Sequence, residues 1–191
     1  TSGIPHSFSG NVQVFQAEAA LWVTIVLMSG FFERHPNINA AVFEASSTWL
    51  SFLLDECDKF YKLYRNDRVL PPLKQLPSET FREHCVTGFE GDESPPSLLP
   101  EFYEDILAWS SDVYHHDGDD VWRAMETMEQ SGLSLKTQAQ FLGGNARRLY
   151  NIEPPREIVR DRVTEIQRPN WWPNEEEIKQ ALRPEASVTR R

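Results

Sequence analysis

The distribution of apolar residues along the chain predicts an alternation of helices and short strands. Residues 11–34 are dominated by Ala, Leu, Val, Ile and Met and predict one long helix that Pro36 brings to an end. Three short, mostly apolar runs follow, the first of them after the turn residues Pro36 and Asn37. These runs are residues 40–43, 86–89 and 106–109. Short runs of this kind are typical of strands that are buried on both faces of a parallel sheet.

Amphipathic segments separate these runs. Thr48 is expected to cap a helix that extends to about Tyr64, with one apolar stripe along it. Further helices are expected at residues 79–85, 101–105, 119–130, 135–142 and 145–150. Helices alternating with strands imply a parallel sheet with crossover helices. Three strands cannot close a barrel and leave sheet edges unpaired, so the chain is expected to be part of a larger α/β structure.

The chain changes in character from residue 152 onward, where prolines recur and only residues 175–182 have a helical pattern. We therefore divide the chain into a body, residues 1–151, and an extended tail, residues 152–191. The tail contains Trp171 and Trp172 beside two prolines, which indicates an apolar anchor. It is expected to pack either on the body or on a neighbouring subunit.

Acidic residues outnumber basic ones by 29 to 19, which gives a net charge of -10. This excess argues against binding to nucleic acid or to an anionic membrane surface. The longest apolar run, Ala19–Met28, contains Thr24 and is too short to cross a bilayer. The two cysteines, Cys57 and Cys85, lie in no zinc-binding or CxxC pattern, so a cytoplasmic protein is expected.

A carboxylate follows each of the three predicted strands. Glu44 and Glu90 come directly after the first two, and Asp112 follows the third after two serines. Because the carboxyl ends of parallel strands meet at one edge of a sheet, these groups are expected to line one pocket. Carboxylates that converge repel one another unless a cation or a shared proton lies between them. The alternative is that strand ends contact water and are acidic for that reason alone.

The segment from Asp112 to Asp117 holds two histidines and two aspartates within six positions. Imidazole and carboxylate are the usual protein ligands of zinc, manganese and iron. For Asp112 and His115 we favour a functional site. For the aspartates at 117, 119 and 120 we favour helix capping.

Four groups of residues together resemble one protein family. They are Phe31–Pro36 with Ala41–Ala45 and Trp49–Leu54; Pro77–Arg82 with Cys85, Phe89 and Glu90; Trp109–Asp112 with His115–Asp117; and Gly143–Tyr150. These segments are similar to the surroundings of strands six, seven and eight and to the closing helix of the amidohydrolase-2 family, the relatives of aminocarboxymuconate semialdehyde decarboxylase. The resemblance covers roughly residues 6–151.

The resemblance implies that the chain is the C-terminal portion, strands six to eight with their helices, of a (β/α)8 TIM barrel that uses a divalent metal ion, zinc, manganese or iron. It implies that Asp112 is the strand-eight metal ligand and accepts a proton from metal-bound water, and that His115 shapes the pocket beside it. Glu44 stands where many members carry a catalytic His, so it is expected to act in catalysis and at the metal.

The family's His-x-His pair and its strand-five His have no counterpart in this chain. The resemblance therefore implies one of two arrangements: a hetero-oligomer in which another polypeptide supplies strands one to five, or a chain that is a fragment of a longer precursor. The expected activity is hydrolysis or decarboxylation of a small carboxylated or cyclic substrate. Two alternatives stay open: an iron-dependent oxygenase on the same barrel, and a non-catalytic structural or regulatory subunit.

Overall fold

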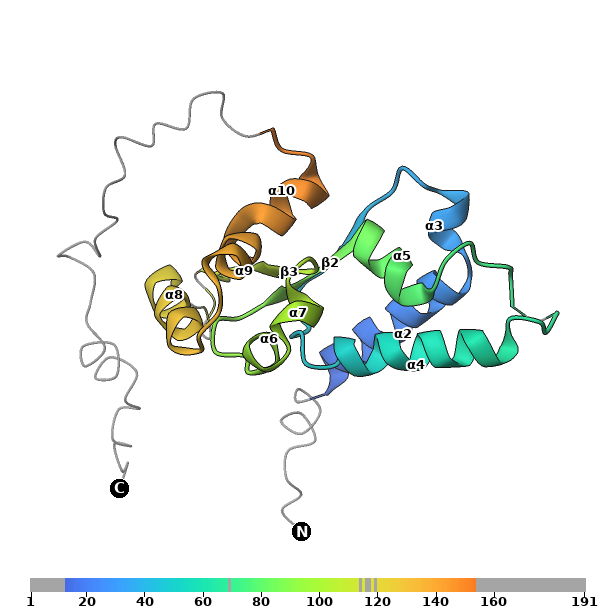
Figure 1. The fold of residues 1–191 in the computed structure, drawn as a ribbon, viewed down its shortest axis with the longest axis horizontal. Helices are drawn as coiled ribbons and strands as arrows, with labels where there is room; N and C mark the ends of the chain where they lie inside the picture. Colours follow the sequence, from blue (N-terminus) through green and yellow to red (C-terminus); the bar gives the residue numbers. More distant parts are fainter. Residues whose placement is uncertain (1–12, 69, 114, 116–117, 119, 154–191) are drawn as a thin grey trace, which may run out of the picture. The chain divides into compact units, whose positions relative to one another are not determined.

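The structure is a computed structural model that describes residues 13–68, 70–113, 115, 118 and 120–153 (Figure 1). Within these residues, three parallel strands form one sheet in the order β1–β2–β3. The strands are β1 (Ala40–Val42), β2 (Cys85–Phe89) and β3 (Leu107–Trp109). Ala41 pairs with Val86, and Gly88 pairs with Ala108. All three carboxyl ends therefore lie at the same edge of the sheet.

Each strand lies where its apolar run predicted it, with small shifts at the ends. β1 stops one residue before Phe43, β2 begins one residue early at Cys85, and β3 begins at Leu107 rather than at residue 106. All five residues of β2 are buried, as expected for the central strand of the sheet.

The first half of the chain contributes the helices α2 (Val14–Met28), α3 (Phe31–Arg34), α4 (Leu50–Tyr64) and α5 (Pro77–His84). The prediction of one continuous helix over residues 11–34 is wrong. Gly30 adopts a left-handed conformation with φ 68° and separates α2 from α3.

The predicted cap at Thr48 is also wrong. α4 begins at Leu50, and Trp49 occupies the N-cap position without a side-chain cap. The Thr48 hydroxyl instead accepts a hydrogen bond of 3.3 Å from the Ser46 hydroxyl within the preceding loop. The predicted apolar stripe of α4 is confirmed, because Leu50, Leu54, Cys57 and Tyr61 are buried.

The second half contributes α6 (Pro95–Leu98), α7 (Pro100–Tyr103), α8 (Val121–Gln130), α9 (Leu135–Ala139), the π-helix η1 (Gln140–Gly144) and α10 (Asn145–Tyr150). The predicted capping role is confirmed for Asp120, whose carboxylate accepts hydrogen bonds from the backbone N–H groups of Trp122 and Arg123.

Apolar clusters lie on both faces of the sheet. The larger cluster joins Val42 and Leu107 to side chains of α2, α4, α5, α8 and η1. The smaller one joins Val86 and Ala108 to Leu149 of α10. Since alternate residues of a strand point to opposite faces, α10 packs on the face opposite α2 and α4. At the edges, β1 and β3 each pair with β2 alone within the part of the chain described.

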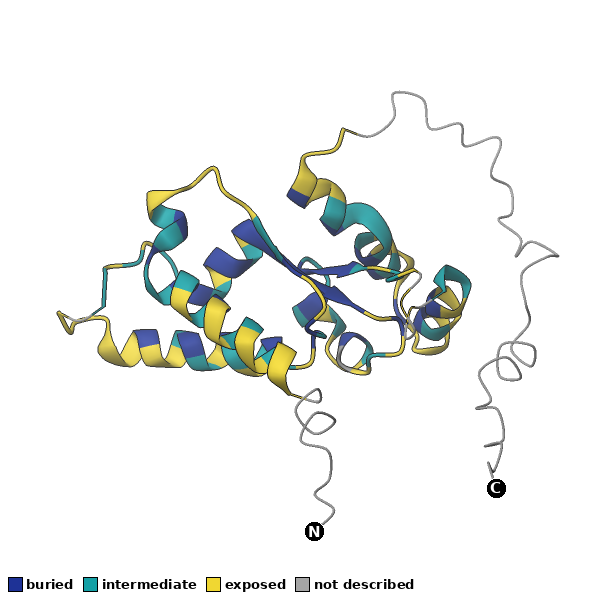
Figure 2. Ribbon diagram, turned by 180° about the vertical axis from the view of Figure 1, so that it is seen from behind, coloured by how far each residue is buried: buried dark blue, intermediate teal, exposed yellow. Residues whose placement is uncertain are grey.

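One side of α2 is apolar and exposed. Val14, Phe15, Leu21, Trp22 and Ile25 are between 46% and 62% exposed. Figure 2 shows exposed and half-buried positions along much of this helix. A helix that is apolar on all sides normally packs against neighbours on all sides. None of the helices in the described ranges is both long enough and apolar enough to traverse a lipid bilayer.

The division into residues 1–151 and 152–191 stays a prediction. Residues 154–191, including the predicted helix at 175–182 and the Trp171-Trp172 pair, lie outside the described residues.

Candidate active site

The carboxylates that follow the three strands line one small pocket at the carboxyl edge of the sheet. Its lining residues are Glu44, Ser46, Gly88, Phe89, Glu90, Glu93, Ser110 and Asp112. The pocket has a volume of about 30 Å³, which is roughly the space of one water molecule. This pocket therefore leaves no room for an organic substrate.

The backbone at this edge is unusual. Glu44, Ser46 and Asp112 have positive φ angles of 57°, 55° and 44°. Such values are unfavourable for residues with a side chain and persist where the surrounding structure imposes them. Apart from Asn151, which ends α10, these are the non-glycine residues with positive φ in the described ranges. The strain is concentrated where the predicted site lies.

Glu93 holds the loop after β1 against the end of β2. Its Oε2 accepts hydrogen bonds from the Ser47 hydroxyl at 2.6 Å, the Ser47 backbone N–H at 2.7 Å and the Ser46 hydroxyl at 3.0 Å. Its Oε1 accepts one from the backbone N–H of Glu90 at 3.0 Å. Glu93 was not among the site residues predicted from the sequence. Its acidic side chain three residues after Glu90 is the only local signal, and its partners lie 46 and 47 residues away.

Two further side chains hold the same loop. The indole N–H of Trp49 donates to the carbonyl oxygens of Ala45 at 2.7 Å and Ser46 at 2.8 Å. The hydroxyl of Tyr103 donates to the carbonyl oxygen of Ser47 at 3.0 Å. Burial raises the pKa of Tyr103 above its ordinary value, so this hydroxyl keeps its proton. The backbone around Glu44 is therefore held from three directions.

His115 lies beside Asp112, as predicted, with Nδ1 3.4 Å from Oδ2. The side chain of His115 is 57% exposed and that of Asp112 36% exposed. His115 is not among the residues that line the pocket. His116 and Asp117 lie outside the described residues.

The described residues do not form a metal site by themselves. No group of three or more His, Cys, Asp or Glu side chains within the described ranges is arranged to hold an ion. The pocket nevertheless brings together the carboxylates of Glu44, Glu90, Glu93 and Asp112, and none of the described residues that line it is basic. Oxygen ligands of this kind accept cations and protons and repel anions.

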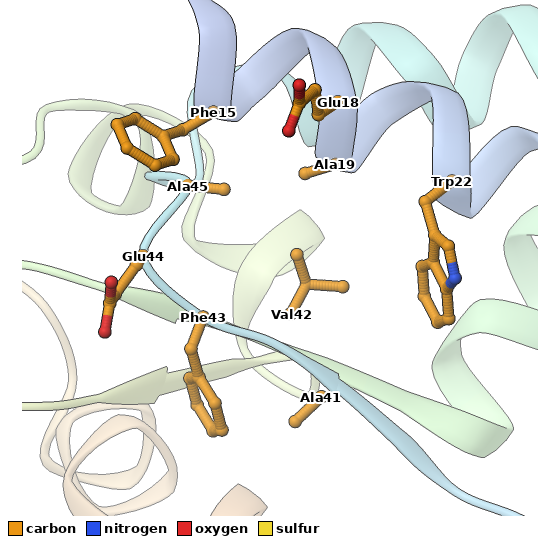
Figure 3. Close-up of a pocket in the computed structure, with 9 residues that line it drawn as sticks. All are labelled: Phe15, Glu18, Ala19, Trp22, Ala41, Val42, Phe43, Glu44 and Ala45. Carbon is orange, nitrogen blue, oxygen red and sulfur yellow. The ribbon is translucent and has the colours of Figure 1, made fainter. Parts of the chain in front are cut away.

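A second, wider pocket opens between α2 and β1. It has a volume of about 450 Å³. Phe15, Ala19 and Trp22 line it from the helix, and residues 41–45 line it from the strand and its exit (Figure 3). Glu44 lines both pockets. Within the described residues, this pocket joins the apolar side of α2 to the exit of β1 and reaches the candidate site at Glu44.

Comparison with protein families gives one match. The family model described as Amidohydrolase matches residues 2–152. No curated protein sequence is detectably similar to the chain.

Several solved structures resemble the chain. The 5-carboxyvanillate decarboxylase of Sphingomonas paucimobilis is 21% identical with a TM-score of 0.53, over 68% of this chain and 38% of that one. A dihydroxybenzoic acid decarboxylase of Polaromonas sp. JS666, with bound manganese and the inhibitor 2-nitroresorcinol, is 18% identical with a TM-score of 0.52, over 69% and 39% of the two chains. The 2,6-dihydroxybenzoate decarboxylase of Rhizobium is 18% identical with a TM-score of 0.53, over 79% and 48%.

At this level of identity the likeness establishes the fold, an α/β structure with a parallel sheet like that in the amidohydrolase barrels. The chain spans less than half of the length of each of these enzymes.

Proposed function

Because this chain belongs to the amidohydrolase family, we propose that it supplies strands six to eight and their helices to a metal-dependent (β/α)8 enzyme. The observation that carries the proposal is the meeting of Glu44, Glu90 and Asp112 at the carboxyl edge of a parallel sheet, where the active sites of such barrels form. The chain's short span relative to its structural neighbours supports completion by strands one to five. These strands belong to another polypeptide or to a longer form of this one.

We propose decarboxylation of a small carboxylated aromatic compound as the reaction. Three of the structural neighbours are decarboxylases of carboxylated phenols. A pocket wall made of carboxylates repels a carboxylated substrate unless a cation lies between them. A divalent ion, such as the manganese of the Polaromonas enzyme, would offset this charge and orient the substrate. Asp112 and Glu44 are proposed to supply ligands to it, and the missing strands the remainder.

Asp112 is proposed to hold and move the proton. Loss of carbon dioxide leaves a carbon that must be protonated, and a carboxylate at a strand end can deliver a proton received from solvent. The contact of His115 with Oδ2 orients Asp112 for this task.

The test is the rate of carbon dioxide release from carboxylated phenols by the completed enzyme, compared among Asp112→Asn, Glu44→Gln and a control, Glu129→Gln. Glu129 lies exposed on α8, away from the strand ends. Loss of a proton donor should lower kcat by about 10² to 10⁴-fold, whereas the control should match the wild type. A folded Asp112→Asn enzyme with full activity would overturn the proposal.

A further inference from the structure

We propose that Glu93 is a positioning residue that keeps Glu44 at the active-site edge by locking the β1–α4 loop, residues 43–49, to the end of β2. The inference rests on the proposed function for the role of Glu44, and on the geometry of the described residues for the role of Glu93. Glu93 lines the same pocket as Glu44, but both of its carboxylate oxygens accept hydrogen bonds from the two loops, so its effect on catalysis is exerted through Glu44.

The loop needs an external constraint. Glu44 and Ser46 both have positive φ, and an isolated loop would relax these residues into more favourable regions. Glu44 is exposed, so its own side chain has little packing to hold it in place. Ser47, three residues further on, is fully buried and is the point at which the loop is anchored.

The carboxylate of Glu93 supplies the hydrogen-bond acceptors that anchor the loop at Ser47. It receives four hydrogen bonds, three from Ser46 and Ser47 on one oxygen and one from the Glu90 N–H on the other. An ionised carboxylate is an acceptor at every lone pair, so it satisfies all four donors at once. The two oxygens serve two different loops, and the side chain therefore sets the distance between the exits of β1 and β2.

Glutamine cannot replace this group, although it has the same shape. Its amide carries one oxygen and one NH₂, so either the three donors of the β1–α4 loop or the N–H of Glu90 would face another donor. Aspartate keeps the charge but is one methylene shorter, so it can reach one of the two loops and not both. Trp49 and Tyr103 still hold the loop in either variant. We therefore expect local loosening around Glu44 and not unfolding.

Hydrogen–deuterium exchange of the full chain tests the anchoring without any need for activity. Glu93→Gln and Glu93→Asp are compared with Glu101→Gln, a substitution of an exposed glutamate in the first turn of α7. Hydrogen bonds to a charged group are strong enough that the amide of Ser47 should exchange about ten- to a hundredfold faster in Glu93→Gln. The amide of Glu90 should also exchange faster, and amides in α4 and α8 should keep their rates.

Steady-state kinetics of the completed enzyme test the consequence for Glu44. A misplaced catalytic group lowers kcat by about ten- to a hundredfold while substrate binding is preserved, so KM should stay within about twofold of the wild type. The kcat of Glu93→Asp should lie between those of Glu93→Gln and the wild type, because the shorter carboxylate can still accept hydrogen bonds from one of the two loops.

Unchanged exchange at Ser47 in Glu93→Gln would overturn the proposal, and so would faster exchange throughout the chain, because that would show a general structural role. If the wild-type enzyme releases no carbon dioxide but exchange changes as expected, the proposed reaction fails and the anchoring by Glu93 stands. If wild-type activity is present and Glu93→Gln leaves kcat unchanged, the positioning role is wrong.

Discussion

The ring of Phe43 occupies the space that a side chain on Gly88 would need. A Cβ atom at Gly88 would lie 2.7 Å from Cδ1 of Phe43, far inside normal contact distance. Phe43 immediately precedes Glu44, and Gly88 lines the pocket at the strand ends. The absence of a side chain at Gly88 thus leaves room for the Phe43 ring beside the central strand.

Gly88→Ala should push Phe43 aside and lower the free energy of unfolding by about 1–3 kcal/mol, measured by urea denaturation. Gly143→Ala is the matched control, because a Cβ there meets no atom within 4 Å. Combining Gly88→Ala with Phe43→Ala should recover most of the lost stability, since Phe43 is itself 44% exposed. If Gly88→Ala and Gly143→Ala are equally stable, the packing of Phe43 does not require the absence of a side chain at position 88.

Asn145 should be important for attaching α10 to the sheet. Its side-chain amide is buried and donates to the carbonyl oxygens of Glu104 at 2.8 Å and Leu107 at 2.7 Å. Asn145→Ala leaves both carbonyl groups without this donor and should lower the free energy of unfolding by about 1–3 kcal/mol. Gln130→Ala, at the exposed end of α8, should have little effect. An Asn145→Ala protein as stable as the wild type would contradict the assignment.

Stability should fall in alkali partly because of Cys85. Burial raises the pKa of the Cys85 thiol from its ordinary 9.0 to about 12. The native state then holds a proton that the unfolded state loses, so the contribution of this group is complete below pH 9 and is lost as the pH rises towards 12. Between pH 9 and 10.5 the free energy of unfolding should decline less in Cys85→Ala than in the wild type, because alanine has no thiol to titrate. The stability lost to the cavity that this substitution leaves is independent of pH. Parallel declines in the two proteins would contradict the assigned shift.

The exposed apolar side of α2 should drive association. Leu21 and Ile25 lie one turn apart and are 62% and 57% exposed. Ile25→Lys should not unfold the chain, because this side chain is already largely in water, but should shift sedimentation towards smaller species. Leu135→Lys, at an exposed position of α9, should leave the sedimentation profile unchanged. A wild-type chain that sediments only as a monomer would show that this surface needs no partner.

The strands could be predicted from the sequence because each is a short apolar run followed by a carboxylate or by a polar segment that leads to one, a signal that is local. The break between α2 and α3 was missed because Gly30 lies inside an otherwise apolar stretch, and one glycine did not outweigh the pattern around it. The Thr48 cap failed because Thr48 bonds to Ser46 in the strained loop, and that strain depends on contacts formed only in the folded chain.

The candidate site could be predicted in part for the same reason. Parallel strands imply that Glu44, Glu90 and Asp112 meet at one edge, and they do line one pocket. Glu93 could not be found this way, since its role comes from Ser46 and Ser47, which are distant in sequence. The roles of Glu44, Asp112 and His115 in metal binding and catalysis stay predictions, as does the cytoplasmic location.

Completion of a metal-dependent barrel by this chain can be observed by native mass spectrometry with metal quantitation. The chain would be isolated through an affinity tag from the cells that produce it. The account predicts a complex in which strands one to five, with their His-x-His pair, accompany this chain, together with about one or two divalent ions such as zinc or manganese. Stoichiometric iron with oxygen consumption would favour the oxygenase alternative. A lone species of 22.1 kDa without metal or partner would contradict the account and favour a non-catalytic role.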